Sequence, residues 1–230
     1  MGCGAANRPS NIQLPEGVSE PPKALEFPSF IIYFGSQTGN AKRFAKELLK
    51  DAREKYEFEA TLAGLERFDT NILLHQKLAL FVVSTHGEGG PTENAQLFYK
   101  WLIKDKDKLE NLRFAIFGCG DSSFSGTFNK MAKATEANLI KRGAQKIFET
   151  GLGDDNKNLN GDFFNWRTKL WPSLIDFYQT EQGVDKTKRI SCMKAYSKKF
   201  TISYDSELKE KLQVSDYSLN AKQYLISSII

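Results

Sequence analysis

The order of the apolar segments constrains the fold of this chain more than any other feature of its sequence. Short apolar runs of strand length alternate with longer segments that have the spacing of amphipathic helices. The clearest buried strand is the run Leu-Ala-Leu-Phe-Val-Val-Ser at residues 78–84, and the clearest helix, at residues 41–56, places Phe44, Leu48 and Ala52 on one side. Such alternation predicts a parallel sheet with helices on both faces.

Five strands and four helices are predicted in this way. The strands are residues 30–34, 58–65, 78–84, 112–117 and 146–151. The helices are residues 41–56, residues 92–104 with Thr92 as the cap, residues 128–141 and residues 162–178. Five parallel strands joined by helices fit a doubly wound α/β fold over residues 30–180.

The two ends of the chain differ from this domain. Residues 1–29 combine prolines with polar residues and predict a disordered leader. Residues 181–230 begin as a linker, include a candidate strand at 199–204 and end in the apolar run 225–230. No run approaches the roughly 18 apolar residues that span a bilayer, and no signal-peptide core is found. We therefore expect a cytoplasmic protein.

Charge and cysteine content exclude several classes of function. The net charge of +4 is too small to favour nucleic acid as a partner. The three cysteines, Cys3, Cys119 and Cys192, have neither a disulfide pattern nor a metal-binding spacing. With only His75 and His86 as histidines, we expect no metal site.

Three loops of unusual composition follow the first, third and fourth predicted strands, at the sheet edge where open α/β sheets bind ligands. The first loop joins a strand to a helix and offers backbone N–H groups, hydroxyls and amides. Its candidate ligands are Ser36, Gln37, Thr38, Gly39, Asn40 and Ala41. Such groups at a helix N-terminus bind phosphate, and the lack of lysine rules out a nucleoside-triphosphate P-loop. The alternative is a glycine-rich turn with a helix cap.

The second loop, residues 84–91, has three glycines within four residues, which lets the backbone approach a flat ligand closely. Its candidate binding residues are Ser84, Thr85, His86 and Gly87. His86 offers a planar ring, and the alternative interpretation is a surface histidine.

The third loop, residues 118–124, begins like a Gly-x-Gly-x-x-Gly dinucleotide fingerprint. Ser123 stands where the third glycine belongs, and the loop follows the fourth strand, so NAD binding is disfavoured. Phe124 in this polar loop indicates an aromatic ring that faces a ligand, with a core aromatic as the alternative. Cys119 is predicted to be a small apolar filler rather than a reactive thiol.

Together the loops predict a phosphate cradle and two planar side chains on either side of a slot. This arrangement suits a phosphorylated aromatic cofactor, which would carry the chemistry itself. Glu88, Asp121 and Asp155 could act as paired acids, but this is the weaker interpretation. No Ser-His-Asp or Cys-His arrangement is found, so no catalytic residue is predicted.

At these residues the sequence resembles the diflavin reductase family, over about residues 30–178. Six pieces match in the family's order: residues 33–41, 84–95, 117–121, 128–129, 151–155 and 162–172. The resemblance implies a flavodoxin-like fold, FMN as cofactor and an oxidoreductase of the NADPH–haemoprotein reductase type.

The resemblance also implies roles for the loop residues. Ser36 to Ala41 would hold the FMN phosphate, and Ser84 to Gly87 would line the flavin ring, with the Gly87 carbonyl facing its N5 atom. The other wall would consist of Cys119, Gly120, Asp121, Phe124, Phe128 and Asn129, and Asp155 would be a further contact. His86 and Phe124 would stack on the two ring faces where most relatives have tyrosines, which can change the redox potential.

The sequence departs from the family's pattern in two ways. Family members usually continue into an FAD- and NADPH-binding half, of which residues 199–230 resemble only the beginning. Gly90 stands where an aspartate is usual, and Asn160-Gly161 where two acids are usual. Residues 30–180 hold 21 Lys and Arg against 19 Asp and Glu. A domain without an excess of acids should steer basic partners less well.

The main prediction is an FMN electron-transfer module that takes electrons from an FAD- and NADPH-containing reductase and gives them to a haemoprotein or another redox acceptor. Such a module should not oxidise NADPH alone. One alternative is a truncated diflavin reductase, and another is a cofactor-free interaction domain, which the phosphate loop argues against. A fourth is a radical enzyme of the wybutosine-synthesising type, but no Cys-x-x-x-Cys-x-x-Cys cluster motif is present.

The first residues suggest one route to a membrane. Gly2 could be myristoylated after removal of Met1, and Cys3 could then be palmitoylated. Two acyl chains are needed for stable anchoring, which would place the protein on the cytosolic face. Ala6 stands where the motif expects Ser or Thr, so an unmodified tail is the alternative.

Overall fold

The computed structural model describes residues 27–104 and 106–183. Most of the predicted leader, including Gly2 and Cys3, lies outside the described residues. The same holds for the predicted linker beyond residue 183, the candidate strand at 199–204 and the apolar run 225–230.

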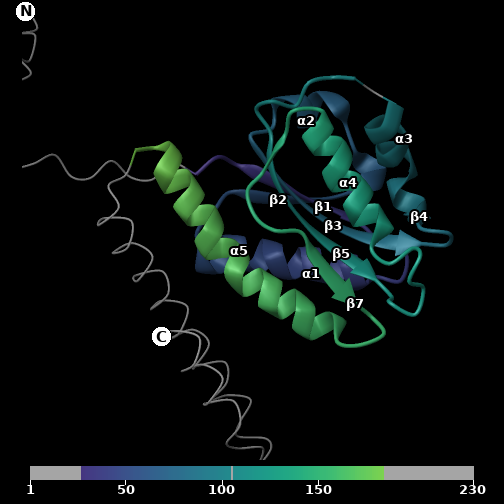
Figure 1. Ribbon diagram of the computed structural model, residues 1–230. Helices are drawn as coiled ribbons and strands as arrows, with labels where there is room; N and C mark the ends of the chain where they lie inside the picture. The colour runs from purple at the N-terminus through teal and green to yellow at the C-terminus, as the bar shows by residue number, and fades with distance from the viewer. Residues whose placement is uncertain (1–26, 105, 184–230) are drawn as a thin grey trace, which may run out of the picture.

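The centre of the domain is a parallel sheet (Figure 1). Its first four strands in spatial order are β2 (Ala60–Gly64), β1 (Phe30–Gly35), β3 (Leu78–His86) and β5 (Arg113–Gly120). The fifth position is shared by β6 (Gln145–Lys146) and β7 (Gly151–Asp154), which both pair with β5 in parallel. The predicted doubly wound parallel sheet is therefore confirmed.

Helices cover both faces of this sheet, and each face has its own core. The helices α1 (Asn40–Lys50) and α5 (Leu159–Glu181) lie on one face, where Phe44, Phe163 and Trp171 pack against the strands. The other face is covered by α2 (Thr70–His75), α3 (Gln96–Lys104) and α4 (Lys130–Lys141). None of the helices among the described residues combines the length and the apolar character needed to cross a bilayer.

The predicted strand over residues 146–151 is wrong in its middle, because the chain leaves the sheet between β6 and β7. The carbonyl of Glu149 accepts a hydrogen bond from Nε1 of Trp166 at 2.8 Å. Lys146 and Thr150 both bond the carboxylate of Glu136 on α4. The N–H of Ile147 still donates to the carbonyl of Phe114 at 3.0 Å, so the chain leaves β5 only after Ile147.

The predicted helix over residues 41–56 has α geometry only to Lys50 and ends in a π turn, η1 (Asp51–Lys55). Asp51 is only 4% exposed. Its carboxylate pairs with Nε of Arg167 at 3.3 Å and accepts a hydrogen bond from Nε1 of Trp171 at 3.3 Å. The π turn therefore coincides with a buried carboxylate that is satisfied by α5.

Three further helices differ from the prediction at their ends. The segment predicted as a helix from Thr92 begins as a 3-10 turn, η3 (Glu93–Ala95), and the Thr92 hydroxyl bonds the side chain of Asn94 instead of capping the helix. Helix α4 starts at Lys130, because Asn129 has a left-handed backbone with φ of 53°. Helix α5 is longer than predicted at both ends.

Three elements were not predicted. A 3-10 turn, η2 (Leu65–Arg67), directly follows β2. Helix α2 has six residues and is capped by Asp69, whose carboxylate accepts hydrogen bonds from the N–H groups of Asn71 and Ile72. Strand β4 (Gly90–Pro91) folds back on the end of β3 as an antiparallel hairpin. This hairpin shapes the second of the three loops.

Candidate functional site

The register of the sheet brings the ends of four strands into one row. The strand pairs nearest this edge are Gly35 with Val83, Ser84 with Cys119, and Gly120 with Asp154. The three loops predicted from the sequence therefore start side by side, in the order first, second, third. Asp155 completes the row, since its N–H donates to the carbonyl of Gly120 at 2.8 Å.

The first loop leaves the N-terminus of α1 open to an anion. Gly39 occupies the N-cap position with φ of 101°, a left-handed conformation that favours glycine. No side chain caps the helix, and its first turn contains no acidic residue. The N–H of Gly39 donates to the hydroxyl of Ser36 at 3.1 Å, which closes the loop on itself. Free backbone N–H groups and the helix dipole favour a bound phosphate here.

The side chain of Asn94 binds the backbone of this loop. Its Oδ1 accepts a hydrogen bond from the N–H of Ser36 at 2.9 Å, and its Nδ2 donates to the carbonyl of Phe34 at 3.3 Å and to Glu66 at 2.9 Å. Asn94 was not predicted as a site residue, although it lies within the segment 84–95 that matches the diflavin reductases. A side chain that bonds another loop gives no local signal in the sequence.

A pocket of about 690 Å³ separates the second loop from the third. Its lining residues are Thr85, His86, Gly87, Glu88, Asp121, Ser123, Phe124, Ser125, Gly126 and Thr127. His86 and Phe124 both line it, as predicted for the two flat side chains. Phe124 is 65% exposed, which rules out the alternative of a core aromatic. An aromatic ring so exposed beside a pocket gains contacts when a flat ligand covers it.

The second loop is a tight hairpin fixed to α4. His86 pairs with Gly90 across the turn, and Gly87 and Gly89 have φ values of 54° and 89°. A Cβ atom on Gly89 would lie 2.5 Å from Cδ of Lys130, so the hairpin packs closely on α4. The N–H of Met131 donates to Oγ1 of Thr85 at 3.2 Å. These contacts hold the backbone of His86 in place beside the pocket.

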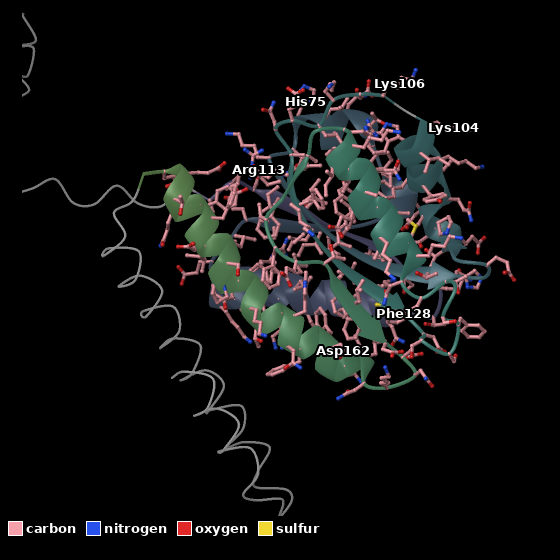
Figure 2. All side chains as sticks on the ribbon, in the orientation of Figure 1. His75, Lys104, Lys106, Arg113, Phe128 and Asp162 are labelled. Atoms are coloured by element: carbon pink, nitrogen blue, oxygen red, sulfur yellow. The ribbon has the colours of Figure 1, made fainter. Side chains whose placement is uncertain are left out.

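Six of the residues predicted beside the ring are not among those that line the pocket: Ser84, Cys119, Gly120, Phe128, Asn129 and Asp155. Asn129 is 0% exposed, and its amide donates to the carbonyl of Gly153 at 3.0 Å. Phe128 lies just before α4 (Figure 2). The ammonium group of Lys133 lies over its ring. Cys119 packs into the core on the α1 and α5 face. Cys119, Phe128 and Asn129 therefore lie next to the residues that line the pocket and not among them.

The burial of Cys119 confirms the interpretation of this residue as a small apolar filler. The side chain is 6% exposed and forms no disulfide among the described residues. Burial raises the pKa of the thiol to about 12, although a hydrogen bond with Ser84 acts in the opposite direction. The thiol is therefore protonated at neutral pH and is not a nucleophile.

Asp154 organises the turn after β7. Burial alone would raise the pKa of its carboxyl group, but hydrogen bonds from Ser122 and Asn156 bring the pKa below its ordinary value. The N–H of Asp154 donates to the carboxylate of Asp162 at 2.9 Å. Neighbouring Asp155 is exposed at the strand edge and is free to meet a ligand.

These features fit a flat group that carries a phosphate. The open helix end suits an anion, and the pocket between His86 and Phe124 suits an aromatic ring. A Cβ atom added at Gly39, Gly87 or Gly126 would meet no atom within 4 Å, so the backbone borders open space at each of these positions. No group of three or more His, Cys, Asp and Glu side chains in residues 27–104 and 106–183 has the arrangement of a metal site.

Comparison with known proteins agrees with this geometry. The flavodoxin family matches residues 32–166. The NADPH–cytochrome P450 reductases of Cavia porcellus and Rattus norvegicus are each 40% identical over 173 residues, and that of Homo sapiens is 39% identical. These alignments cover 73% of this chain and 25% of the relatives, so the chain spans about a quarter of their length.

Solved flavodoxins share the fold. A short-chain flavodoxin associated with a bacterial PDU microcompartment superimposes with a TM-score of 0.55 and 19% identity, and covers 65% of this chain and 97% of its own. A mutant of the flavodoxin from Pseudomonas aeruginosa gives a TM-score of 0.55 with 21% identity over 64% of this chain and 98% of its own.

Proposed function

The chain belongs to the flavodoxin family, and we propose that it binds FMN at the edge described above and passes electrons between two partner proteins. The observation that carries this proposal is the strand register, which aligns an open helix N-terminus with a pocket between two flat side chains. Bound FMN supplies the redox chemistry, and the protein supplies binding and orientation.

The residues divide into three tasks. The loop from Ser36 to Ala41 holds the phosphate with its backbone N–H groups and hydroxyls. His86 and Phe124 stack on the two faces of the ring, and the Gly87 carbonyl faces the ring nitrogen N5. Asp155 lies at the far end of the row and contacts the cofactor there.

Reconstitution with FMN tests the binding site. The purified chain should bind one FMN per chain and quench its fluorescence, with riboflavin binding at least tenfold more weakly because it lacks the phosphate. If FMN at about 50 μM, a weak affinity for a cofactor, causes neither quenching nor a thermal shift, the proposal is wrong.

The relatives suggest the type of electron transfer. The chain is of the oxidoreductase and electron-transfer kind. We propose that its donor is an FAD- and NADPH-containing reductase module and its acceptor a haemoprotein or another redox centre. NADPH should reduce the FMN-loaded chain only when such a reductase is added. Reduction by NADPH alone, in a preparation free of other flavoproteins, would contradict this assignment.

We propose that the protein acts in the cytoplasm, with acylation of Gly2 and Cys3 as its route to a membrane. Both residues lie outside the part of the chain that the structure describes. The intact mass of the protein from its native cell tests acylation directly. A mass with unmodified Gly2 and Cys3, together with recovery only in the soluble fraction, would contradict the anchor.

A further inference from the structure

The exposed side of α1 carries a groove lined by cations. The α1 groove encloses about 380 Å³, and its lining residues are Gly39, Lys42, Arg43, Lys46, Glu47 and Lys50. All four cationic side chains are exposed. Helix α1, which carries the groove, covers the same face of the sheet as α5, and α3 and α4 cover the other (Figure 1).

The positive charge of the α1 groove is mostly uncompensated within the domain. Glu47 is its one acid, and both carboxylate oxygens are engaged, with Arg43 at 3.2 Å and with Arg167 on α5 at 2.6 Å. Among the described residues, no acidic side chain pairs with Lys42 or Lys46. Lys50 reaches Glu54 only at 3.9 Å, with both side chains exposed, so this pair contributes little.

Two of these cations lie where the helix dipole disfavours positive charge. Lys42 and Arg43 are in or next to the first turn of α1, whereas Lys50 is in its last turn. A phosphate held at Gly39 would compensate the nearest charge. Lys46 and Lys50 lie about 6 and 12 Å further along the axis than Lys42, given a rise of about 1.5 Å per residue. These two exposed charges are therefore available to an anionic group other than the cofactor phosphate.

We propose that the α1 groove docks an acidic segment of the electron-transfer partner. The charges are complementary, and the line from Lys42 to Lys50 has the length of about four extended residues at about 3.3 Å each. Gly39 belongs both to this groove and to the phosphate loop, so a segment bound there brings its protein beside the cofactor edge. The partner's role in electron transfer rests on the proposed function, whereas the acidic chemistry of the bound segment rests on the charges of the groove.

An acidic protein segment fits the groove better than an anionic membrane does. The site is concave, whereas a lipid surface meets a protein along a flat or convex face. The groove also has no apolar side chain to insert between lipids, since its residues are glycine and charged side chains. Membrane binding is therefore kept as an outcome of the test.

The test uses the full chain loaded with FMN, and its loading is checked by flavin absorbance before each titration. A fluorescent decapeptide of glutamate and aspartate is titrated, and anisotropy is followed at low and high salt. We expect binding that weakens with salt, because screening shortens the reach of exposed charges. A lysine decapeptide and vesicles containing phosphatidylserine serve as the other ligands. A chain that fails to load FMN contradicts the proposed function, while the peptide titration can still be carried out on it.

A matched pair of variants locates the binding. Lys46→Glu with Lys50→Glu reverses two charges four residues apart at the end of α1. Lys100→Glu with Lys104→Glu makes the same change at the end of α3, on the other face of the sheet (Figure 2). We expect the α1 variant to bind the acidic peptide at least tenfold more weakly and the α3 variant to change by less than twofold, with FMN affinity unchanged in both.

Three results would overturn the proposal. The first is equal loss of peptide binding in the two variants, which would indicate a general charge effect. The second is no binding of the acidic peptide at about 1 mM, the limit of weak affinity. The third is binding to the anionic vesicles or the lysine peptide alone.

Discussion

The side-chain oxygen of Asn94 accepts a hydrogen bond from the backbone N–H of Ser36 at 2.9 Å, across 58 residues of sequence. The same oxygen accepts a hydrogen bond from the hydroxyl of Thr92 at 2.8 Å. The phosphate loop is thus held by the segment that leads into α3. Such support fixes the loop before a ligand arrives, which lowers the cost of ordering it on binding.

Replacement of Asn94 by alanine should therefore affect both stability and cofactor binding. The N–H of Ser36 and the carbonyl of Phe34 lose their side-chain partner, so we expect the free energy of unfolding to fall by about 1–3 kcal/mol. FMN should bind several-fold more weakly. Urea denaturation and a fluorescence titration measure the two effects. Asn111→Ala, at an exposed position, is the control, and equal changes in both variants would contradict the role of Asn94.

Gly118 is required for the close packing of α4 on β5. A Cβ atom at this position would lie 2.3 Å from Oδ1 of Asn129 and 2.6 Å from Cβ of Ala132. We expect Gly118→Ala to lower the free energy of unfolding by about 1–3 kcal/mol through overpacking, and to weaken FMN binding by moving the strand end. Gly126→Ala is the control, because its Cβ atom would meet nothing within 4 Å. Equal stability of the two variants in urea would show that the site adapts without cost.

Much of the fold could be predicted because its signals are local. Strands buried on both faces consist of continuous apolar residues, which is why residues 78–84 and 112–117 were located to within a few residues. The glycine-rich loops marked the strand ends, and the parallel sheet then required them to share one edge. His86 and Phe124 could be predicted as pocket residues on this reasoning alone.

The features that sequence reasoning missed depend on partners far away in the chain. The break in the fifth strand needs Trp166, which bonds the carbonyl of Glu149. The π turn coincides with the bond between Asp51 and Trp171, which are 120 residues apart. Asn129 was predicted to contact the cofactor, but a left-handed backbone turns its amide toward Gly153. None of these pairings leaves a pattern in the local sequence.

The thiol of Cys119 should make stability depend on pH at alkaline values. Burial raises its pKa from 9.0 to about 12, so between these values the unfolded chain has lost a proton that the folded chain retains. The stabilisation is fully present below pH 9.0 and is lost as the pH rises toward 12. In this window the free energy of unfolding should fall with pH in both proteins, and the fall should be steeper in the parent than in Cys119→Ala by up to about 1.4 kcal/mol per pH unit. Parallel urea curves for the two proteins across the window would show that the thiol ionises equally in both states.

The ring of Phe124 should matter for the cofactor and not for the fold. Because the side chain is 65% exposed, we expect Phe124→Ala to change the free energy of unfolding by no more than about 0.5 kcal/mol. Loss of stacking worth about 0.5–1.5 kcal/mol should weaken FMN binding by roughly threefold to tenfold. Phe124→Tyr keeps the ring and should bind FMN like the parent. If Phe124→Ala binds FMN with unchanged affinity, the ring does not face the cofactor.

The last prediction concerns the redox potential of the bound cofactor. His86 lines the pocket at the end of β3, where the hairpin with Gly90 fixes its position. The neutral imidazole ring is less electron-rich than a phenol, and an electron-rich ring against the flavin disfavours its electron-rich reduced form. The midpoint potential should therefore be lower in His86→Tyr than in the parent, while FMN binding and stacking remain. Spectroelectrochemical titration of the two FMN-loaded proteins at one pH measures the difference, with Asn111→Ala as the control at an exposed position. Identical potentials in His86→Tyr and the parent would mean that His86 does not lie against the ring, and the stacking partner on that side would have to be another residue of the pocket.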